Sequence, residues 1–152
     1  MSKPDNLLAS CTETKTDSKI RVEAHTRKAV FDNSERSEIK IVDVDCWLAA
    51  DGGPKADRVV SKPGIVDVVV ELKGKDIDHA LEQILATCAK WKDASPFSKK
   101  IGGLVVFSRS PERSAAVDNW KKRFLQTHGI WLEMNKNNQT EYRFETFTGK
   151  KV

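Results

Sequence analysis

A carboxylate and an ammonium group lie two residues apart, at the end of the segment with the strongest strand signal in the chain. This segment, residues 65–72 (IVDVVVEL), is β-branched and apolar and is followed by Lys73 and a glycine. Because side chains alternate between the two faces of a strand, Glu71 and Lys73 are expected on one face, about 6–7 Å apart. Asp67 is expected on that face as well.

A turn at residues 63–64 brings a further carboxylate toward this pair. Residues 55–60 (KADRVV) are a short strand candidate, and the turn has Pro and Gly in the order that a type II turn favours. If the hairpin is centred near Gly64, Asp57 lies opposite Glu71, with Cβ atoms about 4.5–5.5 Å apart. Two carboxylates at this distance repel unless a cation lies between them. The pair therefore favours Mg²⁺ or Mn²⁺, with the Leu72 carbonyl as a further ligand.

The elements around this pair follow from periodicity and from helix-capping residues. Asp76 is a good N-cap, and apolar residues at helical spacing predict a helix from there to about Trp91. Residues 101–108 form a continuous apolar run, which is typical of a strand buried on both faces. We therefore expect an α/β (α+β) fold, a mixed β-sheet flanked by helices. The remaining predicted elements are a strand or short helix over 20–31, a strand over 38–48, a helix over 111–128 with Ser110 as N-cap and Gly129 at its end, and strands over 130–134 and 142–147.

Composition favours a single globular domain. The chain has 152 residues, of which 39% are hydrophobic and 32% charged, which argues against disorder, collagen and coiled coil. No apolar run approaches the ~20 residues that span a bilayer, and no secretory signal is expected. The three cysteines are odd in number and lack CxxC spacing, which argues against a disulfide scaffold or zinc site and favours a reducing, cytoplasmic setting. We expect a flexible arm over 1–19, one domain over 20–149 and a basic tail over 150–152.

Charge is compatible with nucleic-acid binding without requiring it. The formal net charge is +4 and the isoelectric point is near 9.0. The histidines have no ligand spacing between them. Trp47 and Trp131 lie on strand candidates and are expected in the core, with base stacking as the alternative. Motifs of nucleotide-binding loops, zincins and α/β-hydrolases do not occur.

The stretch 55–83 resembles the PD-(D/E)XK nuclease superfamily, which has the restriction-endonuclease-like fold. The resemblance rests on Asp57, thirteen intervening residues, Glu71-x-Lys73 at the end of an apolar strand, and an amphipathic helix after it. It covers about 30 residues, and the predicted order of elements through residue 108 is that of the family's core sheet. One departure is Ala56 before Asp57, where the family's motif has proline.

The resemblance implies metal-dependent hydrolysis of phosphodiester bonds, with DNA as the expected substrate. Asp57 and Glu71 would hold Mg²⁺, and Lys73 would orient the attacking water and stabilise developing negative charge. Gln83 lies where some members of the family carry an active-site glutamine. The candidate contacts to nucleic acid are Lys75 and His79.

The same residues allow two alternatives. One is a catalytically inactive protein of the same fold, which binds nucleic acid or serves in an assembly; the other is an unrelated interaction protein with a chance E-x-K. Many members of the family supply a glutamate from an upstream helix, and no such helix is evident here, so the number of metals, one or two, stays open. The chain could act as a homodimer or within a larger complex. Further acidic candidates are Glu13, Glu23 and Glu35 for the upstream position, Asp67 in place of Asp57, and Asp43 and Asp45 as extensions of the cluster.

Overall fold

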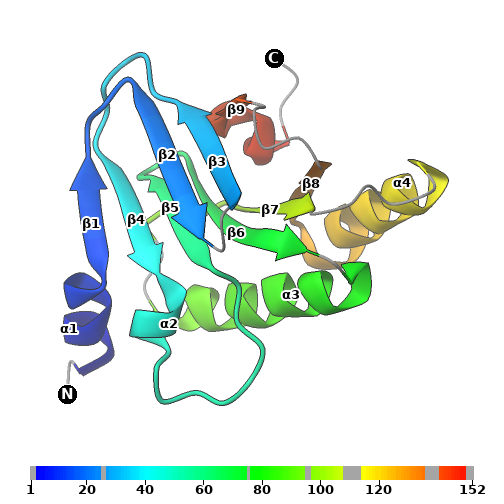
Figure 1. Cartoon of the computed structure of the whole chain (residues 1–152), viewed down its shortest axis with the longest axis horizontal. Coiled ribbons are helices and arrows are strands. Elements are labelled where there is room, and N and C mark those ends of the chain that lie inside the picture. The colour runs from blue at the N-terminus through cyan, green and yellow to red at the C-terminus, as the bar shows by residue number, and fades with distance from the viewer. Residues whose placement is uncertain are drawn as a thin grey trace.

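Two β-sheets and a long helix are layered around the strand that carries Glu71 (Figure 1). The computed structural model describes residues 3–24, 27–74, 76–94, 97–107, 114–135 and 141–149. Within these residues, a six-stranded sheet has the order β1-β4-β5-β6-β7-β8 and a three-stranded sheet the order β2-β3-β9. The strands are β1 (Thr12–Lys15), β2 (Lys19–Ala24), β3 (Arg27–Asp32), β4 (Ile39–Asp43), β5 (Arg58–Lys62), β6 (Val66–Gly74), β7 (Ile101–Phe107), β8 (Trp131–Asn135) and β9 (Glu141–Arg143).

Helices occupy the connections and the ends of the described segments. The longest is α3 (Ile77–Ala94), which connects β6 to β7, and these two strands are parallel. None of the helices in the described segments is long and apolar enough to cross a membrane. The others are α1 (Lys3–Ser10), α2 (Val44–Trp47), α4 (Ser114–Arg123), the π-helical turn η1 (Phe124–His128) and the 3₁₀ helix η2 (Phe144–Thr148).

The predicted hairpin is confirmed in both its turn and its register. The Ile65 N–H donates to the Lys62 carbonyl at 2.9 Å, and Gly64 between them has φ of +83°. A type II turn needs this left-handed conformation at its third residue, which favours glycine. Antiparallel β5 and β6 then pair Arg58 with Val70 and Ser61 with Asp67.

Alternation along β6 divides the core into two clusters. Val69 packs in a cluster with Ile84 and Trp91 of α3. Val68 and Val70 point to the opposite face and pack in a second cluster that includes residues of β2, β3 and η2. Every residue of β7 is buried, as the apolar run predicted. The mixed sheet is confirmed, but the expectation of flanking helices holds for one face, because the three-stranded sheet covers the other (Figure 1).

The N-terminal segment, for which the sequence suggested an arm with a helical turn around residues 6–10, contains a helix and an edge strand. Residues 3–10 form α1, and β1 pairs antiparallel with β4, with Thr12 opposite Val42 and Lys15 opposite Ile39. The sequence argument missed β1 because TETK has no apolar alternation. An edge strand can be polar on both faces and still be held by backbone pairing.

Two further elements differ from the expectation. The strand over 38–48 ends at Asp43, whose side chain accepts from the Cys46 N–H and so begins α2. The strand over 142–147 ends at Arg143 and continues as η2, which buries Phe144 and Phe147. Side chains three residues apart share one side of a 3₁₀ helix, so both rings reach the second core cluster. The expectations for Ser110 and for the basic tail over 150–152 lie outside the described residues.

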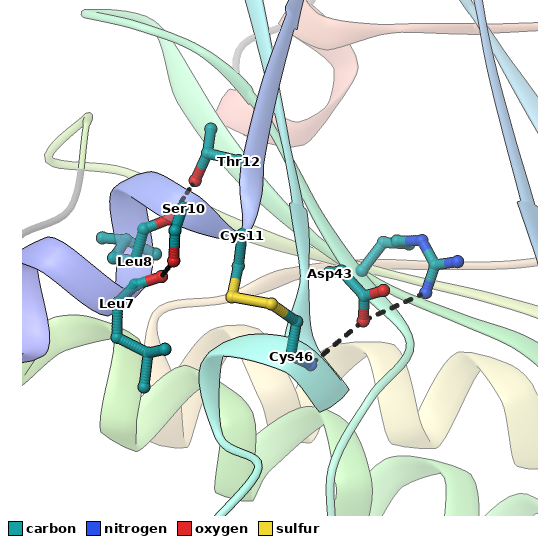
Figure 2. The surroundings of a disulfide bond; sticks show 8 residues. Leu7, Leu8, Ser10, Cys11, Thr12, Asp43 and Cys46 are labelled. Atoms are coloured by element: carbon teal, nitrogen blue, oxygen red, sulfur yellow. Dashed lines mark hydrogen bonds and ion pairs between the residues drawn. A yellow bond between two sulfur atoms is a disulfide. The ribbon is translucent and has the colours of Figure 1, made fainter.

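Cys11 and Cys46 form a disulfide, which the sequence argument did not anticipate (Figure 2). The bond joins the segment after α1 to α2, and the Cα atoms are 5.7 Å apart, within the usual range for a disulfide. The odd number of cysteines argued against a disulfide framework, and a single bond is compatible with that argument. The remaining thiol, Cys88, is buried, and burial raises its pKa to about 12.

Candidate functional site

The carboxylates of Asp57 and Glu71 meet at one end of the β5–β6 hairpin. The Asp57 N–H donates to the Val70 carbonyl at 3.0 Å, although Val70 already pairs with Arg58, so the regular register ends at that pair. The charge of Asp57 and a hydrogen bond between the two side chains both act on Glu71, so the two carboxylates lie close together as predicted, although the regular strand pairs do not include Asp57 with Glu71. The two residues are only 8% and 7% exposed.

The two carboxylates differ in their hydrogen bonds. Asp57 Oδ2 accepts from the backbone N–H of Leu72 at 2.7 Å, which fixes the Asp57 side chain beside β6. Glu71 Oε1 is buried and has no hydrogen-bond partner within the described residues. A buried oxygen without a donor costs about 1–3 kcal/mol, and more when the group is charged. The structure therefore contains an acceptor that a cation or a further donor would satisfy.

The pKa of Glu71 is raised from 4.5 to about 9. Burial is the largest cause, because it disfavours the charged carboxylate. The negative charge of Asp57, the hydrogen bond between the two side chains and the charge of Asp45 raise the pKa further. Without a cation, the Asp57–Glu71 pair therefore favours binding a proton over holding two negative charges. A divalent cation would displace that proton, because metal binding requires the ionised carboxylate.

Helix α3 holds the segment that leads into Asp57. Gln83 Nε2 donates to the Lys55 carbonyl at 2.9 Å, and the Ala56 N–H donates to Thr87 Oγ1 at 2.8 Å. Gln83 and Thr87 are four residues apart and so lie on one side of the helix. The structure thus bonds the Gln83 amide to the backbone two residues before Asp57. Sequence reasoning missed Thr87; the signal was a polar residue on an otherwise apolar helix face.

Asp67 is not part of the carboxylate pair. Its side chain is fully buried and accepts from Ser61 Oγ at 2.5 Å, from Trp91 Nε1 at 2.7 Å and from the Ser98 N–H at 3.1 Å. Three donors satisfy a buried carboxylate. The register thus decides between the two candidates: Asp57 meets Glu71, and Asp67 joins β6 to α3.

Two other acidic candidates lie near the site: Asp45 in the first turn of α2 and Asp43 at its N-cap. Asp45 of α2 is close enough for its charge to raise the pKa of Glu71. Asp43 accepts from the Cys46 N–H and forms an ion pair with Arg58 at 3.7 Å. Asp45 thus extends the negative field around Glu71, whereas Asp43 stabilises the start of α2. Of the upstream glutamates, Glu13 is on β1, Glu23 is on β2, and Glu35 forms an ion pair with Lys62.

The predicted basic residues are placed less completely. Lys73 lies in β6 where the register with β7 shifts, and its side chain is outside the described part of the structure. Lys75 is also outside it. His79 is exposed on α3, and its N–H donates to Asp76 Oδ1 at 3.3 Å, which confirms Asp76 as the cap.

The donor chemistry of the pair suits a hard cation such as Mg²⁺. Over the described segments, no group of three or more His, Cys, Asp or Glu side chains is placed to hold a metal ion. Mg²⁺ is commonly bound by one or two carboxylates and keeps several waters. Asp57 and Glu71, whose Oε1 has no hydrogen-bond partner within the described residues, fit that mode. The Leu72 carbonyl stays a predicted further ligand.

Comparisons with protein-family models, with curated proteins and with solved structures give no match for this chain.

Proposed function

We propose that this chain is a metal-dependent phosphodiesterase, a nuclease of the PD-(D/E)XK kind acting on DNA. The observation that supports it best is the buried Asp57–Glu71 pair with its unpartnered oxygen. A protein that needed only packing at this position would gain by an apolar residue in place of Glu71. A carboxylate held with a strongly raised pKa beside another carboxylate is typical of a functional site.

Each residue has a role that its chemistry can perform. Asp57 and Glu71 would hold Mg²⁺ or Mn²⁺, which when bound lowers the pKa of a bound water and neutralises charge on the phosphoryl oxygens. Lys73 would orient the attacking water and stabilise negative charge as it develops. Gln83 fixes the Lys55 carbonyl and with it the approach to Asp57. Lys75 and His79 are the proposed contacts to the phosphate backbone.

The biological setting belongs to the same proposal. We place the activity in the cytoplasm, as a homodimer or within a larger complex. The Cys11–Cys46 disulfide argues against a cytoplasmic setting, because cytosolic thiols are kept reduced. Activity should therefore be measured with and without reductant, so that the state of this bond is controlled.

The second candidate is an inactive protein of the same fold. A single proton shared by Asp57 and Glu71 would also relieve their repulsion, and the raised pKa of Glu71 is compatible with that state. The described residues also hold no cluster of three ligating side chains. This candidate predicts a fold that does not respond to Mn²⁺.

A cleavage panel tests the proposed activity. Purified protein is incubated with supercoiled plasmid, linear duplex, single strands and RNA, each with Mg²⁺, Mn²⁺ or EDTA. We expect metal-dependent cleavage that Lys73→Ala abolishes, with Lys28→Ala on β3 as the matched control that cleaves like the parent. Equal cleavage by Lys73→Ala would refute the role of Lys73.

A metal titration separates the two candidates. Thermal unfolding is followed with increasing Mn²⁺ for the parent and for Glu71→Gln. The enzyme proposal predicts stabilisation that depends on Mn²⁺ concentration and disappears in the variant. No stabilisation of the parent, together with no cleavage on any substrate, would favour the inactive protein.

A further inference from the structure

A groove of about 1050 Å³ opens at the other end of the parallel strands. We call it the basic groove. It is formed by the turn before β6, the segment before β7, the turn before β8, the end of η2 and one side chain from the last turn of α3. Its lining spans residues 64–65, Lys92, 97–101, 125, 128–131 and 147–149.

The basic groove is separate from the carboxylate pair. The groove is lined by Ile65, Lys100 and Ile130, and each of these residues directly precedes the first residue of a strand. Glu71 lies toward the opposite end of β6, and the strands β6, β7 and β8 are parallel. The groove and the carboxylate pair therefore lie toward opposite ends of the same parallel strands.

The charge of the lining has one sign. Lys92, Lys99, Lys100 and His128 line the groove, and among the described lining residues there is no aspartate or glutamate. The three lysine side chains are exposed. Lys100 Nζ donates to the Thr148 carbonyl at 3.0 Å, which holds this lysine at the mouth. A concave surface with one sign of charge concentrates ligands of the opposite charge.

The basic groove also presents apolar and aromatic surface. Of the described residues, three large hydrophobic side chains are exposed, and two of them, Ile65 and Leu125, line this groove. Trp131 and Phe97 line it half-buried. The indole N–H of Trp131 donates to Glu133 Oε2 at 2.6 Å, which fixes the plane of the ring. Apolar side chains beside lysines suit a ligand that is both anionic and flat.

Glycine turns keep the rim of the groove low. The groove is lined by Gly64, Gly129 and Gly149, which have φ of +83°, +68° and +78°. Residues other than glycine rarely adopt this backbone conformation. A Cβ at Gly64 or Gly129 would meet no atom within 4 Å. These turns therefore leave space at the rim, where a chain could enter and leave.

We propose that the basic groove binds single-stranded nucleic acid. Bases stack on Trp131 and Phe97, and phosphates contact Lys92, Lys99 and Lys100. Aromatic faces beside basic side chains are the usual means by which proteins hold unpaired strands. A duplex hides its base faces and an acidic peptide lacks flat rings, so neither uses the aromatic surface. Binding here does not require the carboxylate pair, so it goes beyond the proposed nuclease activity.

Fluorescence anisotropy of a labelled twelve-nucleotide thymidine strand tests this proposal, with the full chain in EDTA so that cleavage cannot occur. Three phosphate contacts predict that log K falls with log salt with a slope of about −2. Lys99→Gln and Lys100→Gln should each flatten the slope by about 0.7. Trp131→Leu should weaken binding by roughly tenfold through lost stacking. Lys28→Gln is the control and should bind like the parent.

Competition assigns the ligand. An unlabelled single strand should displace the probe at lower concentration than a duplex or an acidic peptide of equal charge. Equal displacement by the peptide, or binding that Trp131→Leu leaves unchanged, would overturn the proposal, as would failure to bind at low salt. Thermal unfolding of each variant confirms that it is folded. Loss of cleavage in Glu71→Gln with intact strand binding would separate this site from the nuclease site.

Discussion

Glu71 is buried beside the negative charge of Asp57, and burial together with this charge raises the pKa of Glu71 to about 9. The two residues lie just beyond Arg58 and Val70, the last regular pair of the hairpin, and both are buried. Asp57 is anchored by the Leu72 N–H, whereas Glu71 keeps one oxygen without a donor. This pairing accounts for the raised pKa of Glu71, and under the proposed function it is also the reason why the site would bind a cation.

The stability of the metal-free protein should fall with pH because of Glu71. Its folded pKa of about 9 exceeds its ordinary value of 4.5, so the native state binds the extra proton between these values. The contribution is fully present below about pH 4.5 and is lost as pH rises toward 9. We expect the parent to lose up to about 4 kcal/mol relative to Glu71→Gln between about pH 5 and 8. Urea unfolding in EDTA measures the difference, and a constant difference would contradict it.

Asp57 should show separate electrostatic and hydrogen-bonding effects. Asp57→Asn keeps an oxygen that can accept from the Leu72 N–H, whereas Asp57→Ala leaves this buried donor unpaired. We expect Asp57→Ala to be less stable than Asp57→Asn by about 1–3 kcal/mol. Both variants remove the charge that raises the pKa of Glu71, so that pKa should fall in both. Chemical denaturation and NMR titration of the Glu71 carboxyl provide the measurements, and equal stability of the variants would argue against the hydrogen bond.

The Ser61–Asp67 bond should matter for folding and not for metal binding. Ser61 Oγ donates to a fully buried carboxylate, so Ser61→Ala should cost about 1.5–3 kcal/mol. Ser34 donates to Asp32 in the same manner at an exposed position, and Ser34→Ala should cost less than about 0.5 kcal/mol. Stabilisation by Mn²⁺ should persist in both variants. Loss of the Mn²⁺ response in Ser61→Ala would place Asp67 in the metal site.

Gly102 should tolerate no side chain. A Cβ at this position of β7 would lie 2.6 Å from Phe147 Cβ, in the core between the sheet and η2. We expect Gly102→Ala to cost about 1–3 kcal/mol, because overpacking forces strand and helix apart. Gly52, where a Cβ would meet no atom within 4 Å, is the matched control. Similar unfolding free energies for the two alanine variants would show that η2 does not press on β7.

The Cys11–Cys46 bond should stabilise the fold when it is oxidised. It closes a loop over a sequence separation of 35 residues, for which loop-closure entropy predicts about 2–4 kcal/mol. Reductant should lower the stability of the parent to that of a Cys11→Ser, Cys46→Ser double variant and leave the variant unchanged. Denaturation with and without reductant is the measurement. An equal effect of reductant on both proteins would mean that another process is involved.

Local sequence determined the hairpin, its register and the strand–helix–strand unit after it. The turn at residues 63–64 has few alternatives, and a period of two then sets which residues face each other. Asp57 and Glu71 could thus be paired from sequence, and so could the apolar face of α3. These predictions depend on neighbours close in the chain, where turn geometry and periodicity are sufficient.

Only the tertiary structure decided what covers each face and which polar residues are buried. The pairing of β1 with β4, the second sheet and the Cys11–Cys46 bond join segments whose own sequences carry weak signals. From the sequence, Asp67 and Asp57 were equally good candidates for the carboxylate pair. In the structure, Ser61, Trp91 and Ser98 donate hydrogen bonds to Asp67. The basic groove is likewise assembled from turns far apart in the chain. Such contacts are set by packing between distant segments, which local periodicity does not encode.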